Sequence, residues 1–268
     1  MKLRHRLLRA LYAAPAIPGR DRLIGAVAGS FVSRPVRVPG GLLMDLDAAE
    51  WVQLDLLARG EREPKTLRLI SKLVRAGDQV LDVGAHVGHH AIVAAKAAGV
   101  SGMVHAFDPQ PYNADRVARN VVLNKLSNVT VVCAAVGSRD GFTQIAMQSE
   151  RDRARLSLAA PGPNDLAVLI EVPLRRLDTY LQDHGVTEVR LLKIDVEGYE
   201  LEVLRGMGSR LQACRNVILE LLEGAEPGME KGILDLLADS GFELRDVDGN
   251  VWVPGQPLIE RNVWASLR

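Results

Sequence analysis

Several features that mark special classes of protein are scarce in this sequence. It contains two cysteines, Cys133 and Cys214, which cannot build a disulfide framework or supply a four-ligand zinc site. Its 24 glycines follow no repeat, which excludes collagen-like and solenoid architectures. No segment reaches the ~20 apolar residues of a membrane-spanning helix, and Arg9, Pro15 and Pro18 break up the apolar stretch that a signal peptide requires. These absences favour a globular protein of a reducing, cytoplasmic compartment.

The overall composition is that of a globular protein. Of the 268 residues, 47% are hydrophobic and 25% are charged, so there is enough apolar material for a full core. At roughly 150 residues per domain, the length corresponds to one or two domains. A single large α/β domain fits equally well.

The formal net charge is zero, but its distribution along the chain is uneven. Residues 1–40 contain eight Lys or Arg and one acid, which gives +7, and the remainder therefore carries −7. A basic arm on an acidic body indicates contact with an anionic partner or with the body itself. Because no basic stretch interleaved with aromatic residues occurs elsewhere, we do not expect nucleic acid as the main substrate.

The start of the basic arm has the pattern of an amphipathic helix. On one helical face it carries four leucines, Leu3, Leu7, Leu8 and Leu11. This pattern suits either a surface helix or an arm packed on its own domain. We therefore divide the chain into a basic helical extension, residues 1–60, and an α/β domain, residues 61–268. Peripheral contact of residues 1–40 with the inner face of a membrane stays open.

From about residue 64 onward, helical and strand-like patterns alternate, which predicts a parallel sheet with helices on both faces. Seven strands are expected, at Gln79–Val83, Val104–Asp108, Val129–Val136, Arg190–Ile194, Val217–Leu222, Phe242–Val247 and Asn262–Leu267. Phe142–Met147 and Leu166–Val172 are expected to pair as an extra hairpin around the polar loop 148–165. Seven strands in this rhythm match the Rossmann-like α/β fold of the class I S-adenosylmethionine (SAM) methyltransferases, in which the last two strands form a hairpin.

A glycine-bearing turn, Gly84–Gly88, connects the first strand to the next helix, where an open α/β sheet binds its ligand. Its glycines allow close approach of the backbone, and the helix N-terminus offers N–H donors to a carboxylate. A dinucleotide site needs G-x-G-x-x-G, but His86 and His89 occupy two of these glycine positions. A SAM site tolerates this change, since SAM has no pyrophosphate. The candidate cofactor-binding residues here are Asp82, Gly84, Ala85, His86 and Gly88.

An acid at the end of the second strand supports an adenosine cofactor. Asp108 follows Asp82 by 26 residues. Rossmann-like folds place an acid at this point, where it accepts hydrogen bonds from both ribose hydroxyls. The residue does not distinguish NAD from SAM.

The fourth strand ends in a group of acids that includes Asp195 and Glu197. Alternation along the strand sends Lys193 and Asp195 to one face, so Asp195 reaches the same crevice as Asp82. There it can hold the cofactor amino group, orient a hydroxyl group or accept its proton. With Glu220 of the fifth strand, Asp195 and Glu197 could also hold Mg²⁺. Nothing in their spacing demands a metal, however, and we expect none.

Three histidines lie in the turn and at the start of the helix, at positions 86, 89 and 90. Adjacent histidines at a helix start diverge around the axis, so we expect one or two to line the site instead of binding a transition metal. One of them can accept a proton near neutral pH.

These motifs resemble those of the FkbM family of SAM-dependent methyltransferases. The matching segments are 80–88, 104–113, Asn120 with Asn124, 129–137, 172–178 and 192–206. The most specific of them is the Asp-x-Glu-Gly-x-Glu cluster at 195–200. Two positions depart from the family, which more often has asparagine at the position of His86 and glutamate at that of Asp108.

The resemblance implies that SAM is the methyl donor of an enzyme that methylates a hydroxyl group of a sugar, a glycolipid or a polyketide-type natural product. We expect Asp195 beside the transferred methyl group, with Glu197 or a histidine such as His89 as the proton acceptor. Ala135, within the matching segment 129–137, and Asp195 complete the predicted cofactor contacts. Two other functions stay open, an NAD-dependent oxidoreductase and a non-catalytic adenosine-binding scaffold.

Overall fold

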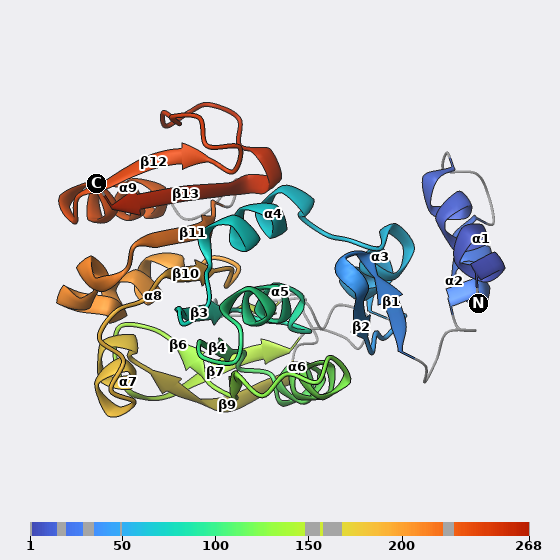
Figure 1. Ribbon diagram of the computed structural model, residues 1–268, viewed down its shortest axis with the longest axis horizontal. Coiled ribbons are helices and arrows are strands. Elements are labelled where there is room, and N and C mark those ends of the chain that lie inside the picture. The colour runs from blue at the N-terminus through green and yellow to red at the C-terminus, as the bar shows by residue number, and fades with distance from the viewer. Residues whose placement is uncertain are drawn as a thin grey trace.

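A seven-stranded sheet forms the centre of the protein (Figure 1). The computed structural model describes residues 2–14, 20–28, 35–48, 50–147, 156–157, 168–221 and 228–267. The strands lie in the order β12 (Phe242–Asp246), β13 (Asn262–Leu267), β11 (Asn216–Glu220), β10 (Leu191–Ile194), β3 (Gln79–Val83), β4 (Met103–Phe107) and β5 (Val129–Val132). The strands from β11 to β5 are parallel, and β13 runs antiparallel to both of its neighbours. The predicted α/β fold with seven strands and a C-terminal hairpin is confirmed.

Helices cover both faces of this sheet, as the alternating pattern predicts. One face is covered by α4 (Pro64–Leu73), α5 (His89–Ala98) and α6 (Pro111–Leu123), the other by α7 (Leu177–Asp183), α8 (Glu200–Met207) and α9 (Met229–Asp239). Each face has its own apolar core. Val80 of β3 packs on the first side, and its neighbours Leu81 and Val83 pack on the second. By the same alternation, Asp82 and the paired Lys193 of β10 point to the α4–α6 side.

The structure corrects the prediction of one long third strand over Val129–Val136. After β5 the chain turns, with the Ala134 N–H bonded to the Val132 carbonyl at 3.0 Å, and Ala135 then joins a second sheet. That sheet consists of β6 (Ala135–Val136), β9 (Val168–Arg175), β7 (Gly141–Met147) and β8 (Leu156–Ser157), in this order. The strands β7 and β9 pair antiparallel, so the predicted extra hairpin is confirmed. Most of the predicted loop 148–165 lies outside the described residues.

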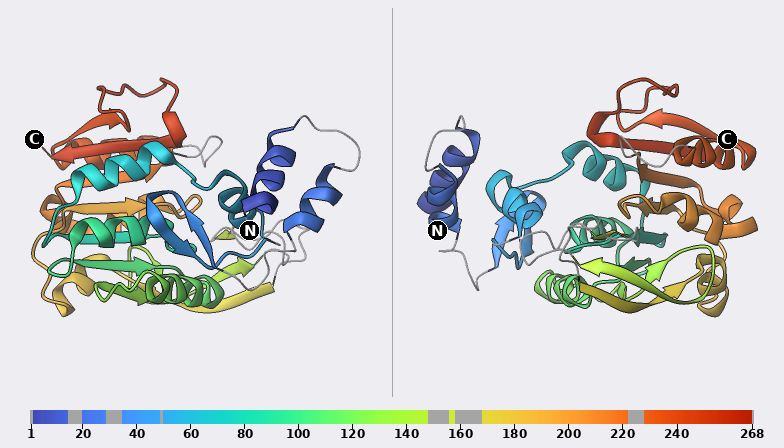
Figure 2. Two further views of the ribbon diagram at one scale, coloured as in Figure 1. Left: turned by 45° about the vertical axis from the view of Figure 1, so that its right-hand side comes forward. Right: turned by 180° about the vertical axis from the view of Figure 1, so that it is seen from behind.

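The N-terminal extension forms its own group of elements beside the main sheet (Figures 1 and 2). It consists of α1 (Lys2–Ala13), α2 (Arg20–Ala28), a hairpin of β1 (Val36–Val38) and β2 (Leu42–Met44), and α3 (Trp51–Arg59). The described chain also has three short 3-10 helices, η2 (Pro39–Gly41), η3 (Gly208–Ala213) and η4 (Ile259–Arg261). No described helix combines the length and the apolar character that crossing a bilayer requires.

The first helix packs on the protein with only part of its predicted apolar stripe. Leu8 is fully buried, and Arg9 Nε donates to the Ala58 carbonyl of α3 at 3.1 Å. Leu7, in contrast, is 49% exposed. The sequence left open whether this helix packs on its own domain or is a surface helix. Leu8 packs on the protein, whereas Leu7 faces outward.

Asn120 of α6 and Asn124, which caps the C-terminus of that helix, attach the extension to the main body. Asn124 pairs with the backbone of Leu43 as a neighbouring strand would. Its Oδ1 accepts from the Leu43 N–H at 3.0 Å, and its Nδ2 donates to the Leu43 carbonyl at 2.7 Å. Asn120, fully buried, accepts from the Asp45 N–H at 2.6 Å and donates to the Val87 carbonyl at 2.9 Å. Asn120 therefore links the extension to α6 and to the turn before α5.

We predict that Asn120→Ala lowers the free energy of unfolding by about 2–4 kcal/mol, because it leaves the Asp45 N–H and the Val87 carbonyl without their partner. Denaturant titration measures this loss. The control is Val122→Ala on the same helix, where the valine is 74% exposed. That change should alter stability by less than about 0.5 kcal/mol. Equal midpoints for the two variants would contradict the linking role of Asn120.

Candidate active site

A pocket that is open to solvent lies at the carboxyl ends of β3, β4 and β10. Its lining includes most of the predicted site residues, namely Gly84, Ala85, His86, His89, Asp108, Ala135, Asp195 and Glu197. Parallel strands bring these ends to one edge of the sheet, where an open α/β fold places its ligand. Two predicted residues, Asp82 and Gly88, are buried and are not among the described residues that line the pocket.

Two glycines shape the turn that precedes α5. Gly84 has a φ of +85°, and a Cβ atom there would lie 1.7 Å from the Asp195 carbonyl oxygen, so only glycine fits. Gly88 has a φ of +82° and caps the start of α5, where a Cβ atom would lie 3.1 Å from Val117 Cγ1. Gly88 thus sets where the helix begins. His86 between them also has a positive φ, of 51°, a conformation that asparagine and histidine adopt more readily than most residues.

Asp108 is held by three N–H groups. Its Oδ2 accepts from the His86 backbone N–H at 2.8 Å, and its Oδ1 accepts from the Gln110 backbone N–H at 2.9 Å and from Asn113 Nδ2 at 3.1 Å. Burial raises the pKa of Asp108 to about 6, although these hydrogen bonds oppose the rise. Asn113 also lines the pocket, and its buried Oδ1 has no hydrogen-bond partner within the described structure. Asp108 and Asn113 therefore offer acceptor atoms to a ligand that carries hydroxyl groups.

The buried ammonium group of Lys193 lies between two acids. Its Nζ is 3.0 Å from Asp195 Oδ2 and 4.0 Å from Asp82 Oδ1, and the lysine side chain is 2% exposed. Burial disfavours the charge on Lys193, but Asp195 and Asp82 outweigh it and raise the pKa. Burial raises the pKa of Asp82 to about 6, whereas Lys193 overcomes burial at Asp195 and lowers its pKa. Asp82 is thus the partner of Lys193 behind the pocket wall.

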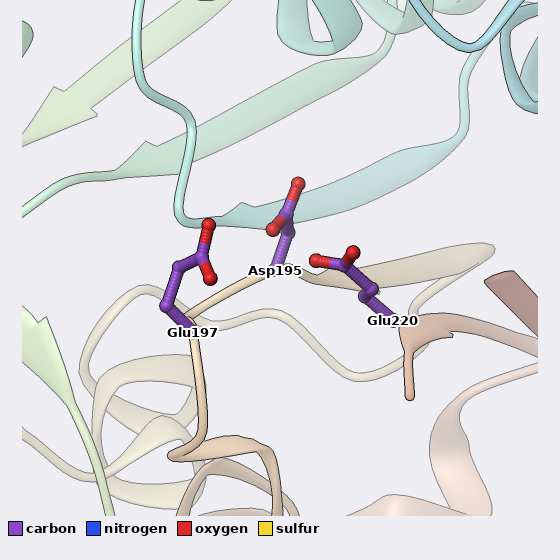
Figure 3. A group of neighbouring side chains, drawn as sticks. All are labelled: Asp195, Glu197 and Glu220. Carbon is purple, nitrogen blue, oxygen red and sulfur yellow. The ribbon is translucent and has the colours of Figure 1, made fainter. Parts of the chain in front are cut away.

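The carboxyl groups of Asp195, Glu197 and Glu220 converge (Figure 3). One oxygen of each lies within 4.8 Å of the others. Burial and the charge of Asp195 raise the pKa of Glu220 to about 8, and the carboxyl group of Glu220 hydrogen-bonds that of Asp195. Oxygen ligands of this kind suit Mg²⁺ or Ca²⁺. Since Lys193 already supplies a positive charge to Asp195, the arrangement does not demand a metal.

Residues of the N-terminal extension and of the segment after it close one side of the pocket. Val52 and Leu56 of α3 line it, as do Arg62 and Glu63 from the segment before α4. Sequence reasoning missed all four residues. They are of common types and stand in a stretch without a motif, so no local signal could have identified them.

Two glutamates from this region face the histidines of the cofactor turn. Glu50 Oε2 lies 3.4 Å from His86 Nε2, and Glu63 Oε2 lies 3.4 Å from His90 Nε2. Glu50 is 1% exposed and also caps the N-terminus of α3. His89 lies buried against the pocket without such a partner among the described ion pairs, and burial lowers its pKa to about 4. The histidines therefore diverge, as predicted, and two of them contact acids that precede α4 in the chain.

Comparison with known proteins identifies relatives that transfer methyl groups. Residues 82–244 match the family model of the methyltransferase FkbM domain. The hexuronic acid methyltransferase AglP of Haloferax volcanii is 28% identical over 184 residues, which are 68% of this chain and 70% of AglP. The methyltransferase sdnD of Sordaria araneosa is 30% identical over 205 residues, which are 66% of this chain and 78% of sdnD.

Solved structures of methyltransferases are similar at lower identity. The methyltransferase FkbM of Methylobacillus flagellatus is 15% identical with a TM-score of 0.46, and the match covers 92% of this chain and 59% of that one. A TehB-like SAM-dependent methyltransferase of Corynebacterium glutamicum is also 15% identical with a TM-score of 0.46, and the match covers 81% of this chain and 95% of that one.

We predict that Asp82→Asn stabilises the ligand-free protein near neutral pH. The pKa of Asp82 is raised from its ordinary value of 3.8 to about 6 in the folded state. The charged carboxylate therefore disfavours folding by an amount that grows between about pH 4 and pH 6 and persists above. Asparagine removes this cost, so the free energy of unfolding should rise by about 1–3 kcal/mol at about pH 7.5 and stay unchanged at about pH 4.

Denaturant titrations at both pH values measure this difference. Asp115→Asn alters a carboxyl group of α6 whose side chain is 56% exposed, and as the control it should change stability by less than about 0.5 kcal/mol. A gain of equal size at both pH values would contradict the prediction. A loss of stability at the higher pH would mean that the attraction to Lys193 outweighs the burial of Asp82.

Proposed function

This chain belongs to the FkbM family of methyltransferases, as its motifs predict, and from this premise we propose that it transfers the methyl group of SAM to a hydroxyl group of a sugar, a glycolipid or a polyketide-type natural product. Family membership sets aside the two alternatives, an NAD-dependent oxidoreductase and a non-catalytic scaffold. The observation that carries the choice of methyl donor is the acid-lined pocket at the carboxyl ends of the strands.

The charge of this pocket suits SAM better than a dinucleotide. Its lining contains the acids Glu63, Asp108, Asp195 and Glu197. SAM has a sulfonium and an ammonium group, which such acids attract, whereas they would repel the pyrophosphate of NAD. The N-terminus of α5 offers N–H donors to the carboxylate of SAM. Asp108 and Asn113 would accept hydrogen bonds from the ribose hydroxyls.

When bound, SAM supplies an electrophilic methyl group on its sulfonium. The protein has to align the acceptor oxygen with that group and take up the hydroxyl proton. Lys193 keeps Asp195 ionised, so Asp195 is suited to orient the hydroxyl by accepting its hydrogen bond. We assign the role of proton acceptor to Glu197, which lies beside Asp195 and is the exposed member of the group Asp195, Glu197 and Glu220. Burial lowers the pKa of His89 to about 4, below that of an ordinary imidazole, and we assign His89 to the pocket wall.

The acceptor class has two supports. AglP acts on a hexuronic acid, which is a sugar derivative. The convergent carboxyl groups of Asp195, Glu197 and Glu220 also form a set of hydrogen-bonding groups that suits the several hydroxyls of a sugar ring (Figure 3).

Titration calorimetry tests the cofactor. We expect SAM and S-adenosylhomocysteine to bind and NAD not to bind. Asp108→Ala should weaken SAM binding by about 100-fold, because two hydrogen bonds from hydroxyl groups to a carboxylate are lost. Asp108→Glu, which introduces the residue more usual in the family, should restore most of the affinity, and Asp183→Ala on the exposed surface of α7 should leave it unchanged. NAD binding in place of SAM, or unaltered affinity of Asp108→Ala, would refute the cofactor site.

Transfer of labelled methyl groups from SAM to methyl glucoside, methyl glucuronide and related sugars tests the catalytic assignment. Asp195→Ala and Glu197→Gln should each lower the rate by about 10²-fold or more. Glu197→Gln should keep its affinity for S-adenosylhomocysteine, because only the proton acceptor has changed. Glu188→Gln, at a side chain that is 73% exposed, is the matched control. Full turnover by Asp195→Ala would count decisively against its role.

A further inference from the structure

The helices α1 and α2 form a hairpin that stands apart from the main sheet (Figures 1 and 2). The hairpin lies within residues 1–40, which carry +7 while the rest of the chain carries −7. Such a separation of charge attracts a negatively charged surface to one end of the molecule and turns the acidic body away from it.

The hairpin also exposes large apolar side chains next to its basic residues. Leu7 of α1 is 49% exposed and Leu23 of α2 is 55% exposed. Arg6, which precedes Leu7 in α1, is exposed as well. Helices that combine basic and apolar side chains in this way bind at the interface of anionic membranes, where the charges meet headgroups and the apolar side chains enter the acyl boundary.

The hairpin is anchored to the helix that lines the pocket. Leu8 is fully buried, and Arg9 Nε bonds the Ala58 carbonyl of α3 at 3.1 Å. The same helix α3 contributes Val52 and Leu56 to the pocket wall. A surface that binds α1 would therefore hold the pocket close to itself.

We propose that this hairpin docks the protein on an anionic lipid bilayer, with Leu7 and Leu23 in the interface and the basic residues against the headgroups. The charge alone would also attract nucleic acid, but exposed leucines add nothing to phosphate contacts and fit a lipid boundary. This docking does not depend on the proposed reaction. It would bring the pocket to acceptors that lipids carry.

Co-sedimentation of the full chain with vesicles tests the proposal. We expect binding to vesicles of phosphatidylglycerol in phosphatidylcholine, little binding to phosphatidylcholine alone, and release at about 1 M salt, where the Debye length falls to about 3 Å. Leu7→Ser combined with Leu23→Ser should weaken partitioning about tenfold or more. A triple variant, Lys2→Glu, Arg6→Glu and Arg22→Glu, takes residues 1–40 from +7 to +1 and should weaken it by about as much.

Matched controls lie on the main body. Val100 and Val122 are 93% and 74% exposed, and Val100→Ser and Val122→Ser should bind vesicles as the unaltered chain does. All these variants should keep their SAM affinity, since none of the altered residues is among the described residues that line the pocket. A failure of vesicle binding is thus distinguishable from a failure of the proposed function. Equal binding by all variants, binding that salt does not release, or capture of duplex DNA without capture of vesicles would overturn the docking proposal.

Discussion

One buried cation makes the acid-rich edge of this sheet tenable. Asp82 lies on β3, Asp195 directly follows the neighbouring parallel strand β10, and Glu220 lies on the next strand, β11. Unpaired carboxylates in such a place would each cost several kcal/mol. Lys193, 3.0 Å from Asp195 and 4.0 Å from Asp82, offsets that cost from inside the sheet. The register of β10 against β3 pairs Lys193 with Asp82, so the backbone pairing itself sets the electrostatics of the pocket.

The main sheet could be predicted because its strands are short apolar runs, each bounded by a local stop signal. The break within Val129–Val136 could not, since that run is rich in β-branched residues and Cys133 and Ala134 carry no turn signal. What ends β5 there is a distant partner. Ala135 pairs with Leu174 of β9, almost forty residues later in the chain. Local propensity favoured one continuous strand, and long-range pairing decided otherwise.

The part of the candidate site that lies at the ends of strands could be predicted from the sequence. That Asp108, Asp195 and Glu197 line one pocket could be predicted from their positions after the strands, because the carboxyl ends of parallel strands meet at one edge of the sheet. The sequence also placed Asp82 near this edge of the sheet. It did not show that Asp82 lies beside the buried Lys193 and outside the pocket lining, because the sequence indicates the direction of the Lys193 side chain only through strand alternation. Asn120 and Asn124 matched a motif of the family, but the sequence indicated no role for them. In the structure their side-chain amides hydrogen-bond the backbone of the extension.

The extension and the segment after it contribute residues to the pocket lining, although neither contains a recognisable motif. The family model begins at residue 82. One wall of the pocket is formed by residues that precede this point in the chain, namely Val52, Leu56, Arg62 and Glu63. The boundary at residue 60 stays a prediction about chain organisation, yet the pocket itself spans it. If SAM occupies the turn side, as we propose, the acceptor would bind in the rest of the pocket, part of which this wall forms. The choice of acceptor would then reside in the part of the chain with the weakest family signature.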